Sequence, residues 1–195
     1  DLVQTAAKAL GAEPVFVKSA WPTLMKDFIE KCDVAVGGIS VTLDRQKTAF
    51  FSQAYMVNGK APITRCENVA KFQTVADINK PTVTVITNPG GSNERFVRAN
   101  LPLAKVVVYN DNVTIFDEIL KGNADVMISE SVETITQQKA RPGLCAVNPD
   151  RPLQYGEMAY LLPRGDVAMK DWVDTWLHLS KAGGEYARLL ADWTR

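Results

Sequence analysis

The chain has 195 residues, 46% of them hydrophobic, which is enough to bury the core of one large domain or of two smaller ones. Its 22 basic residues balance 22 acidic ones, so bulk charge favours neither nucleic acid nor a membrane surface as a partner. No apolar run approaches the roughly 20 residues of a membrane span. Recognition of an anion would therefore have to come from a local site.

The first eleven residues have the pattern of an amphipathic helix that ends at Gly11. No strand and no signal segment precede this helix. We therefore expect the chain to be truncated at its N-terminus. A signal peptide would have been lost with the missing part, so its absence does not argue for the cytoplasm.

Helical and strand patterns alternate along the rest of the chain, which predicts an α/β fold with largely parallel sheets. The expected strands are 14–17, 33–36, 63–66, 82–86, 105–109, 124–128, 144–147 and 158–162. The expected helices are 1–10, 21–31, 93–99, 113–121, 132–139, 167–181 and 184–193.

Connecting segments near 58–61 and 149–156 bracket the central α/β block. This pattern is expected when a chain crosses twice between two lobes. We assign residues 1–60 and 154–195 to the first lobe and residues 61–153 to the second. Clefts between domains are favoured ligand sites.

The cysteines are Cys32, Cys66 and Cys145, and no pair has the spacing of metal ligands. Cys66 ends one expected strand and Cys145 begins another, so they are the favoured disulfide pair. Cys32 is expected to behave as a small core residue. A disulfide would favour an oxidising compartment. With a single histidine, His178, a metal site is not predicted. His178 lies within an expected helix, and the sequence shows no catalytic pattern that would include it.

The segment from Gly37 to Arg45 combines a strand end, two glycines, two hydroxyl groups and an arginine. Ser40 and free backbone N–H groups can donate hydrogen bonds to an anion, and Arg45 can bind a carboxylate through two parallel hydrogen bonds. The alternative is that Ser40 and Thr42 cap the next helix while Arg45 forms a surface ion pair. Composition alone does not decide between them.

A second candidate anion site follows the strand that ends at Ile86. Asn88, a glycine-rich turn containing Gly91, and Ser92 lead into a helix, whose first N–H groups can bind an anion. The spacing fits neither the P-loop nor the dinucleotide-binding pattern. An ordinary capped helix is the alternative.

Two further groups of candidate residues are Glu130 and Glu133, between the expected strand 124–128 and the helix 132–139, and Lys60, in the first connecting segment. Glu130 and Glu133 would share a helical face, where acidic residues commonly interact only with the helix dipole. Lys60 either is solvated or supplies positive charge to the cleft. Trp21, before Pro22, is a candidate aromatic contact for a ligand.

Gly38-Ile-Ser-Val-Thr-Leu-Asp-Arg45, together with Ala49-Phe-Phe-Ser52, resembles the periplasmic amino-acid-binding proteins of ABC transporters, and the resemblance covers nearly the whole chain. It implies a two-lobed, type II periplasmic-binding-protein-like fold and a periplasmic location. Asn88-Pro-Gly-Gly91 and Asp111-Asn-Val-Thr-Ile-Phe116 are more similar to a catalytic branch of that family, the cyclohexadienyl dehydratases.

The resemblance to this branch implies that prephenate or arogenate loses water and carbon dioxide in the cleft, with no metal or organic cofactor. Glu133 would be the general acid and Lys60 would add cationic charge. The other implied substrate contacts are Trp21, Ser40, Arg45, Asn88, Gly91, Ser92 and Glu130.

Expulsion of hydroxide needs a proton, and a carboxylic acid can supply it if burial raises its pKa. The alternative is an amino-acid receptor in which Glu130 pairs with the ammonium group of the ligand. The expected partner is thus a small carboxylate, with no nucleic acid and no membrane span. The sequence leaves open whether the protein forms a homo-oligomer.

Overall fold

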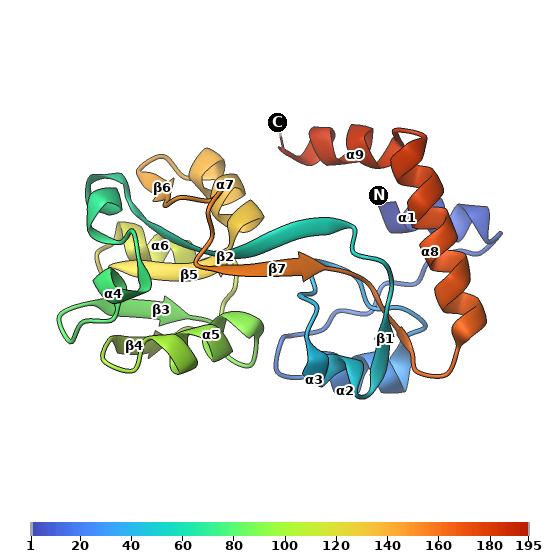
Figure 1. Cartoon of the computed structure of the whole chain (residues 1–195), viewed down its shortest axis with the longest axis horizontal. Helices are drawn as coiled ribbons and strands as arrows, with labels where there is room; N and C mark the ends of the chain where they lie inside the picture. The colour runs from blue at the N-terminus through green and yellow to red at the C-terminus, as the bar shows by residue number, and fades with distance from the viewer. Residues whose placement is uncertain (1, 195) are drawn as a thin grey trace. The chain divides into compact units, whose positions relative to one another are not determined.

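The computed structural model of the protein describes residues 2–194, with side chains as far as Asp192 (Figure 1). The chain divides into two compact units: unit 1 consists of Asp1–Met56 and Glu157–Arg195, and unit 2 of Val57–Gly156. The sequence placed Lys60 in the first lobe. The structure places it in unit 2, because its strand pairs there with the strand that ends at Glu130.

Unit 2 is built on a sheet with the strand order β4-β3-β5-β2-β6, and β7 also pairs with β2. The strands are β2 (Met56–Arg65), β3 (Thr84–Thr87), β4 (Lys105–Val108), β5 (Val126–Glu130), β6 (Leu144–Ala146) and β7 (Gln154–Met158). The helices of the unit are η1 (Cys66–Lys71), α4 (Val75–Ile78), α5 (Ser92–Asn100), α6 (Ile115–Leu120) and α7 (Ser131–Ala140).

The strands of unit 2 do not all run in the same direction. β3 is parallel to β4 and to β5, whereas β2 is antiparallel to β5 and to β6. The expectation of largely parallel sheets was therefore wrong for β2. Alternation of helices and strands predicts α/β packing, but it does not fix the direction of a strand at the point where the chain enters a unit.

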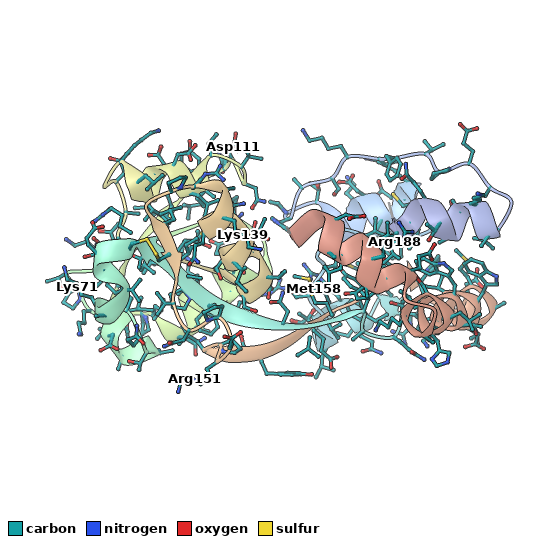
Figure 2. The ribbon with its side chains drawn as sticks, turned by 90° about the horizontal axis from the view of Figure 1, so that it is seen from above. Lys71, Asp111, Lys139, Arg151, Met158 and Arg188 are labelled. Carbon is teal, nitrogen blue, oxygen red and sulfur yellow. A yellow bond between two sulfur atoms is a disulfide. The ribbon has the colours of Figure 1, made fainter. Side chains whose placement is uncertain are left out.

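Apolar clusters cover both faces of this sheet. Neighbouring residues of a strand point to opposite faces, so successive residues pack in different clusters. Val85 of β3 packs in one apolar cluster with Phe96 and Val97 of α5. Ile86, the next residue, packs in another with Phe116 of α6. Charged side chains such as Lys71 and Arg151 are exposed on the outside of unit 2 (Figure 2).

Unit 1 contains a two-stranded antiparallel sheet of β1 (Ala49–Phe51) and β8 (Leu161–Pro163). Its helices are α1 (Leu2–Ala9), α2 (Leu24–Lys31), α3 (Leu43–Gln46), α8 (Val167–Ala182) and α9 (Glu185–Thr194). Leu24 and Phe28 of α2 lie in one core cluster, and Leu177 of α8 lies in another. The N-terminal helix was predicted to begin at Asp1, which lies outside the described residues.

Three strand predictions in unit 1 were wrong. Residues 14–17 form no strand, and Val15 and Phe16 are exposed there rather than paired. In 33–36 only Ala35 makes an isolated bridge, to Leu161. Segment 158–162 is divided between the end of β7 and β8. Apolar and β-branched composition favours a strand, but pairing requires a neighbouring edge.

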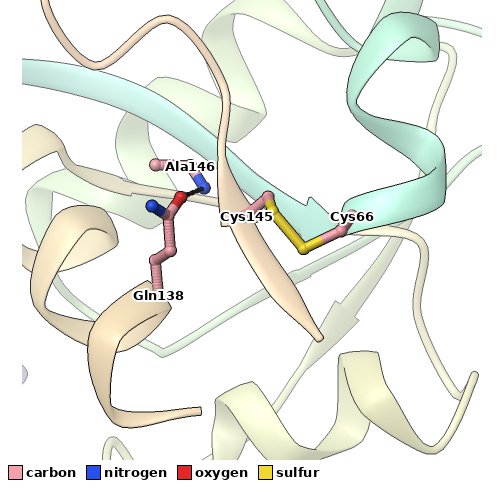
Figure 3. The surroundings of a disulfide bond; sticks show 4 residues. All are labelled: Cys66, Gln138, Cys145 and Ala146. Atoms are coloured by element: carbon pink, nitrogen blue, oxygen red, sulfur yellow. Dashed lines mark hydrogen bonds between the residues drawn. A yellow bond between two sulfur atoms is a disulfide. The ribbon is translucent and has the colours of Figure 1, made fainter. Parts of the chain in front are cut away.

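The disulfide of unit 2 joins Cys66 to Cys145, with the Cα atoms 4.8 Å apart (Figure 3), which confirms the predicted pair. It links the residue after β2 to the middle of β6. Gln138 of α7 accepts a hydrogen bond from the Ala146 N–H beside it at 2.8 Å, so α7 is also tied to β6. Cys32 is a free cysteine that packs against a core cluster of unit 1.

Candidate functional site

The strand register of unit 2 brings a buried lysine and a buried glutamate together. Lys60 of β2 is directly opposite Glu130 of β5 in the antiparallel ladder, where facing side chains are neighbours. Lys60 Nζ lies 2.5 Å from Glu130 Oε1, and the two residues are only 6% and 8% exposed. A buried charge needs a partner and further hydrogen bonds, and this pair supplies the partner.

The start of α5 supplies two more contacts to the same ammonium group. Lys60 donates hydrogen bonds to Ser92 Oγ at 2.8 Å and to Asn93 Oδ1 at 2.6 Å. Ser92 is the first residue of the helix, and Gly91 is its N-cap. The glycine-rich turn predicted from the sequence therefore leads two polar side chains to Lys60.

Glu133 lies in the first turn of α7, immediately after β5. Its Oε2 accepts a hydrogen bond from Ser129 Oγ, a fully buried hydroxyl group of β5. Burial raises the pKa of the Glu133 carboxyl group, and the nearby Glu130 carboxylate acts in the same direction. The Ser129 hydroxyl and the Lys60 ammonium oppose this rise. The result is a carboxylic acid that holds its proton to a higher pH than an ordinary glutamate.

Asn58 fixes the start of α7. Its Oδ1 accepts hydrogen bonds from Ser131 Oγ at 2.6 Å and from the Val132 N–H at 3.2 Å. Asn58 thus caps α7, because it pairs with a backbone N–H of the first turn. The N-cap residue itself, Glu130, makes no side-chain cap. Asn58 is 4% exposed, and its Nδ2 has no hydrogen-bond partner among the described residues.

Asn88 lies just after β3 and is 2% exposed. Its Nδ2 donates a hydrogen bond to Asn112 Oδ1. Gly90 has a φ of 77°, which favours glycine, and its N–H donates to Glu94 Oε2 at 2.7 Å. These contacts fix the turn that precedes Ser92.

In unit 1, Arg45 is buried rather than on the surface. It is 6% exposed, its Nη1 donates to the Ser40 carbonyl oxygen at 2.7 Å, and its guanidinium carbon lies 5.9 Å from the centre of the Trp21 ring. Thr42 caps α3 by accepting from the Arg45 N–H. Of the alternative interpretation, the Thr42 cap is present, but Arg45 is buried rather than on the surface.

The structure groups the predicted residues by unit. Lys60, Ser92, Glu130 and Glu133 form a connected polar cluster in unit 2, which we call the Lys60 cluster together with Asn93 and Ser129. Asn88 and Gly91 lie on the turn before it. Arg45, Ser40 and Trp21 are grouped in unit 1.

The sequence analysis assigned no role to three residues of unit 2 that contact the predicted site residues or the start of α7: Asn58, Asn93 and Ser129. Ser129 had a detectable signal, because it is a hydroxyl residue that directly follows the apolar residues 126–128. His178 is exposed on α8. Among residues 2–194 no group of three or more histidine, cysteine or acidic side chains could hold a metal ion, and no helix there is long and apolar enough to cross a membrane.

Comparison with known proteins places the chain in a family. Residues 1–195 match the bacterial extracellular solute-binding proteins, family 3. The chain is 47% identical over 194 residues to the cyclohexadienyl dehydratase of Pseudomonas aeruginosa, covering 99% of this chain and 72% of that protein. This chain belongs to the bacterial extracellular solute-binding proteins of family 3, whose two-lobed fold it has.

Solved structures agree with this assignment. An ancestral amino-acid-binding protein, described as a precursor of cyclohexadienyl dehydratase, superposes with a TM-score of 0.91 at 28% identity, covering 100% of this chain and 83% of that one. An ancestral cyclohexadienyl dehydratase is 45% identical, with a TM-score of 0.54, covering 98% and 80% of the two chains. The family therefore includes binders and enzymes, and the site must distinguish them.

Proposed function

We propose that the protein is a cyclohexadienyl dehydratase that converts prephenate, arogenate or both into an aromatic product. The similarity to the Pseudomonas aeruginosa enzyme over nearly the whole chain supports this function. The observation that carries it is Glu133, a carboxyl group of the Lys60 cluster whose pKa is raised by burial. A raised pKa suits a general acid, whereas recognition of an amino acid makes no use of it.

The reaction needs one proton and the correct distribution of charge. The bond between the ring carbon and its hydroxyl oxygen breaks, and the proton of Glu133 joins the departing oxygen to form water. The bond to the ring carboxylate breaks at the same time, and its electron pair enters the ring as carbon dioxide leaves. Aromatisation drives the step. Glu133 is left as a carboxylate and is protonated again from solvent.

The other site residues would bind the substrate. We propose that Arg45 contacts a substrate carboxylate, since a guanidinium group matches a carboxylate with two hydrogen bonds. Ser40 and Trp21 would assist in unit 1. In unit 2, Lys60 would supply positive charge, and Ser92, Gly91 and Asn88 would form a polar wall.

The experiment is a turnover assay with prephenate in which phenylpyruvate is followed, for the intact protein and for Glu133→Gln. We expect kcat to fall by about 10²- to 10⁴-fold in the variant, the usual contribution of a general acid. Glu118→Gln is the matched control, because Glu118 is a glutamate of α6 in the same unit that pairs with the exposed Lys121. No turnover by the intact protein would refute the proposed activity, whereas full turnover by Glu133→Gln would refute only the role of Glu133.

An amino-acid receptor is the second candidate, favoured by the likeness to the ancestral amino-acid-binding protein. This function requires the Glu130 carboxylate for the ammonium group of the ligand. Lys60 already donates to that carboxylate at 2.5 Å, so an ammonium group would have to compete with it. We therefore expect calorimetry with free amino acids to give weak binding or none, and micromolar binding would favour the receptor.

We also propose a periplasmic location. The chain belongs to a family of extracellular proteins, and its disulfide suits an oxidising compartment. Fractionation of cells that express the full-length gene tests this, and recovery only with the cytoplasmic fraction would contradict it.

A further inference from the structure

The polar side chains of unit 2 form one connected chain of hydrogen bonds that ends at Glu133. Lys60 Nζ donates to Asn93 Oδ1 at 2.6 Å, and Asn93 Nδ2 donates to Ser129 Oγ at 3.3 Å. Ser129 Oγ in turn donates to Glu133 Oε2. Lys60, Asn93 and Ser129 are each at most 9% exposed, so solvent does not compete strongly for these bonds.

The directions of the two bonds made by Asn93 follow from the first member of the chain, Lys60. An ammonium group can only donate, so the Asn93 atom facing Lys60 must be the amide oxygen. The amide nitrogen must then face Ser129 and donate to it. A serine hydroxyl group has a single hydrogen, which Ser129 donates to Glu133 while its oxygen accepts from Asn93.

We propose that Asn93 and Ser129 are positioning residues that keep Glu133 Oε2 unprotonated, so that the catalytic proton is carried on Oε1. This inference rests on the proposed function of Glu133 as general acid. An oxygen that accepts the only hydrogen of Ser129 cannot at the same time present its own hydrogen to that hydroxyl group. The acid proton is therefore held on the other oxygen, Oε1.

The same bond serves the product of proton transfer. When Oε1 has given its proton to the departing hydroxyl group, the carboxylate formed on Glu133 still accepts the Ser129 hydrogen. Hydrogen bonds to a charged acceptor are stronger than those to a neutral one, so Ser129 stabilises the carboxylate more than the acid. The charged groups that act on Glu133 are Glu130 at the end of β5 and Lys60 on β2. α5 contributes the neutral Ser92 and Asn93 to this cluster.

The test combines a titration with kinetics. The Glu133 carboxyl group is followed by carbon-13 NMR in protein labelled at glutamate, with Glu133→Gln used to assign the signal. In Ser129→Ala we expect the titration of Glu133 to move to higher pH, because the bond that favours the carboxylate is lost. We also expect kcat to fall about tenfold with KM unchanged, because Ser129 acts through Glu133 rather than on the substrate. Ser129→Thr, which keeps the hydroxyl group, should restore both values.

Thr134→Val is the matched control, since it removes a fully buried hydroxyl group from α7, one that donates to the Ser131 carbonyl oxygen at 2.7 Å. It should lower stability without moving the titration. An unchanged titration of Glu133 in Ser129→Ala would overturn the proposal, and so would an equal shift in Thr134→Val. The titration needs no turnover, so it gives its answer even if the proposed activity fails.

The part played by Asn93 is tested by combining variants. Asn93→Leu should lower kcat less than Ser129→Ala does, and it should add nothing when Ser129 is already alanine, because the two residues act on Glu133 through one bond. Independent, multiplicative losses would show that Asn93 acts by another route and would overturn its place in the chain.

Discussion

The Lys60–Glu130 pair makes a sharp prediction about stability. In Lys60→Met the Glu130 carboxylate stays buried without its cation, and loss of one partner of a buried pair costs about 3–5 kcal/mol of the free energy of unfolding. Glu130→Gln should cost a similar amount, because the Lys60 ammonium is then uncompensated. The double variant Lys60→Met/Glu130→Gln should recover most of the loss, since a neutral pair leaves no buried charge.

The magnitude follows from the environment of the pair. The two side chains are 8% and 11% exposed and 2.5 Å apart, so water screens them little. The exposed pair of Lys47 and Asp44, at 73% and 75%, is the control, and Lys47→Met should cause no measurable change. Urea unfolding gives the free energies.

The two units can be followed separately in this experiment. All four tryptophans of the chain lie in the segments that form unit 1, so their fluorescence reports that unit alone. Far-UV circular dichroism reports both. We expect Lys60→Met to lower the dichroism midpoint by more than the tryptophan midpoint. Single losses below about 1 kcal/mol, or a double variant as unstable as the sum of the single ones, would refute the argument from burial.

Three more predictions concern unit 2. Folding raises the pKa of Glu133, so between the pKa values of the unfolded and folded states the folded protein binds more protons, and its stability falls there as pH rises. Glu133→Gln should remove this pH dependence and should be the more stable protein at pH 7. Thermal unfolding across a range of pH measures both effects. Asn58→Ala removes the cap of α7 and should lower the free energy of unfolding by about 1–2 kcal/mol, measured by urea titration. Replacing Cys66 and Cys145 by serine opens a loop with a sequence separation of 79 and should cost up to about 4–5 kcal/mol, and an unchanged midpoint would contradict this.

The fold could be predicted from the sequence where local pattern and burial agree. The helices α5 and α7 and the strands β3 to β6 lie within a few residues of their expected positions, because apolar periodicity there matches two covered faces of a sheet. The strand prediction for 14–17 was wrong because apolar composition does not show whether a neighbouring strand is available for pairing. The prediction of a parallel β2 was wrong for a related reason, because the direction of pairing depends on the path of the whole chain.

The candidate site, too, could be predicted from the sequence only in part. Glu133 and Lys60 could be singled out by type and by resemblance, but their link through Asn93 and Ser129 could not. That link depends on the register of β2 with β5 and on the side of α5 that faces β5. Both are tertiary facts that no spacing within one segment contains.

The disulfide of unit 2 has a mechanical consequence. Cys66 and Cys145 are 79 residues apart, and the segment between them holds every residue of the Lys60 cluster except Lys60. A force that pulls on the two ends of the chain bypasses this closed ring. In a single-molecule stretching experiment the oxidised protein should be shorter at full extension by about 27 nm than the reduced one. A protease cut inside the ring would leave the two pieces covalently joined.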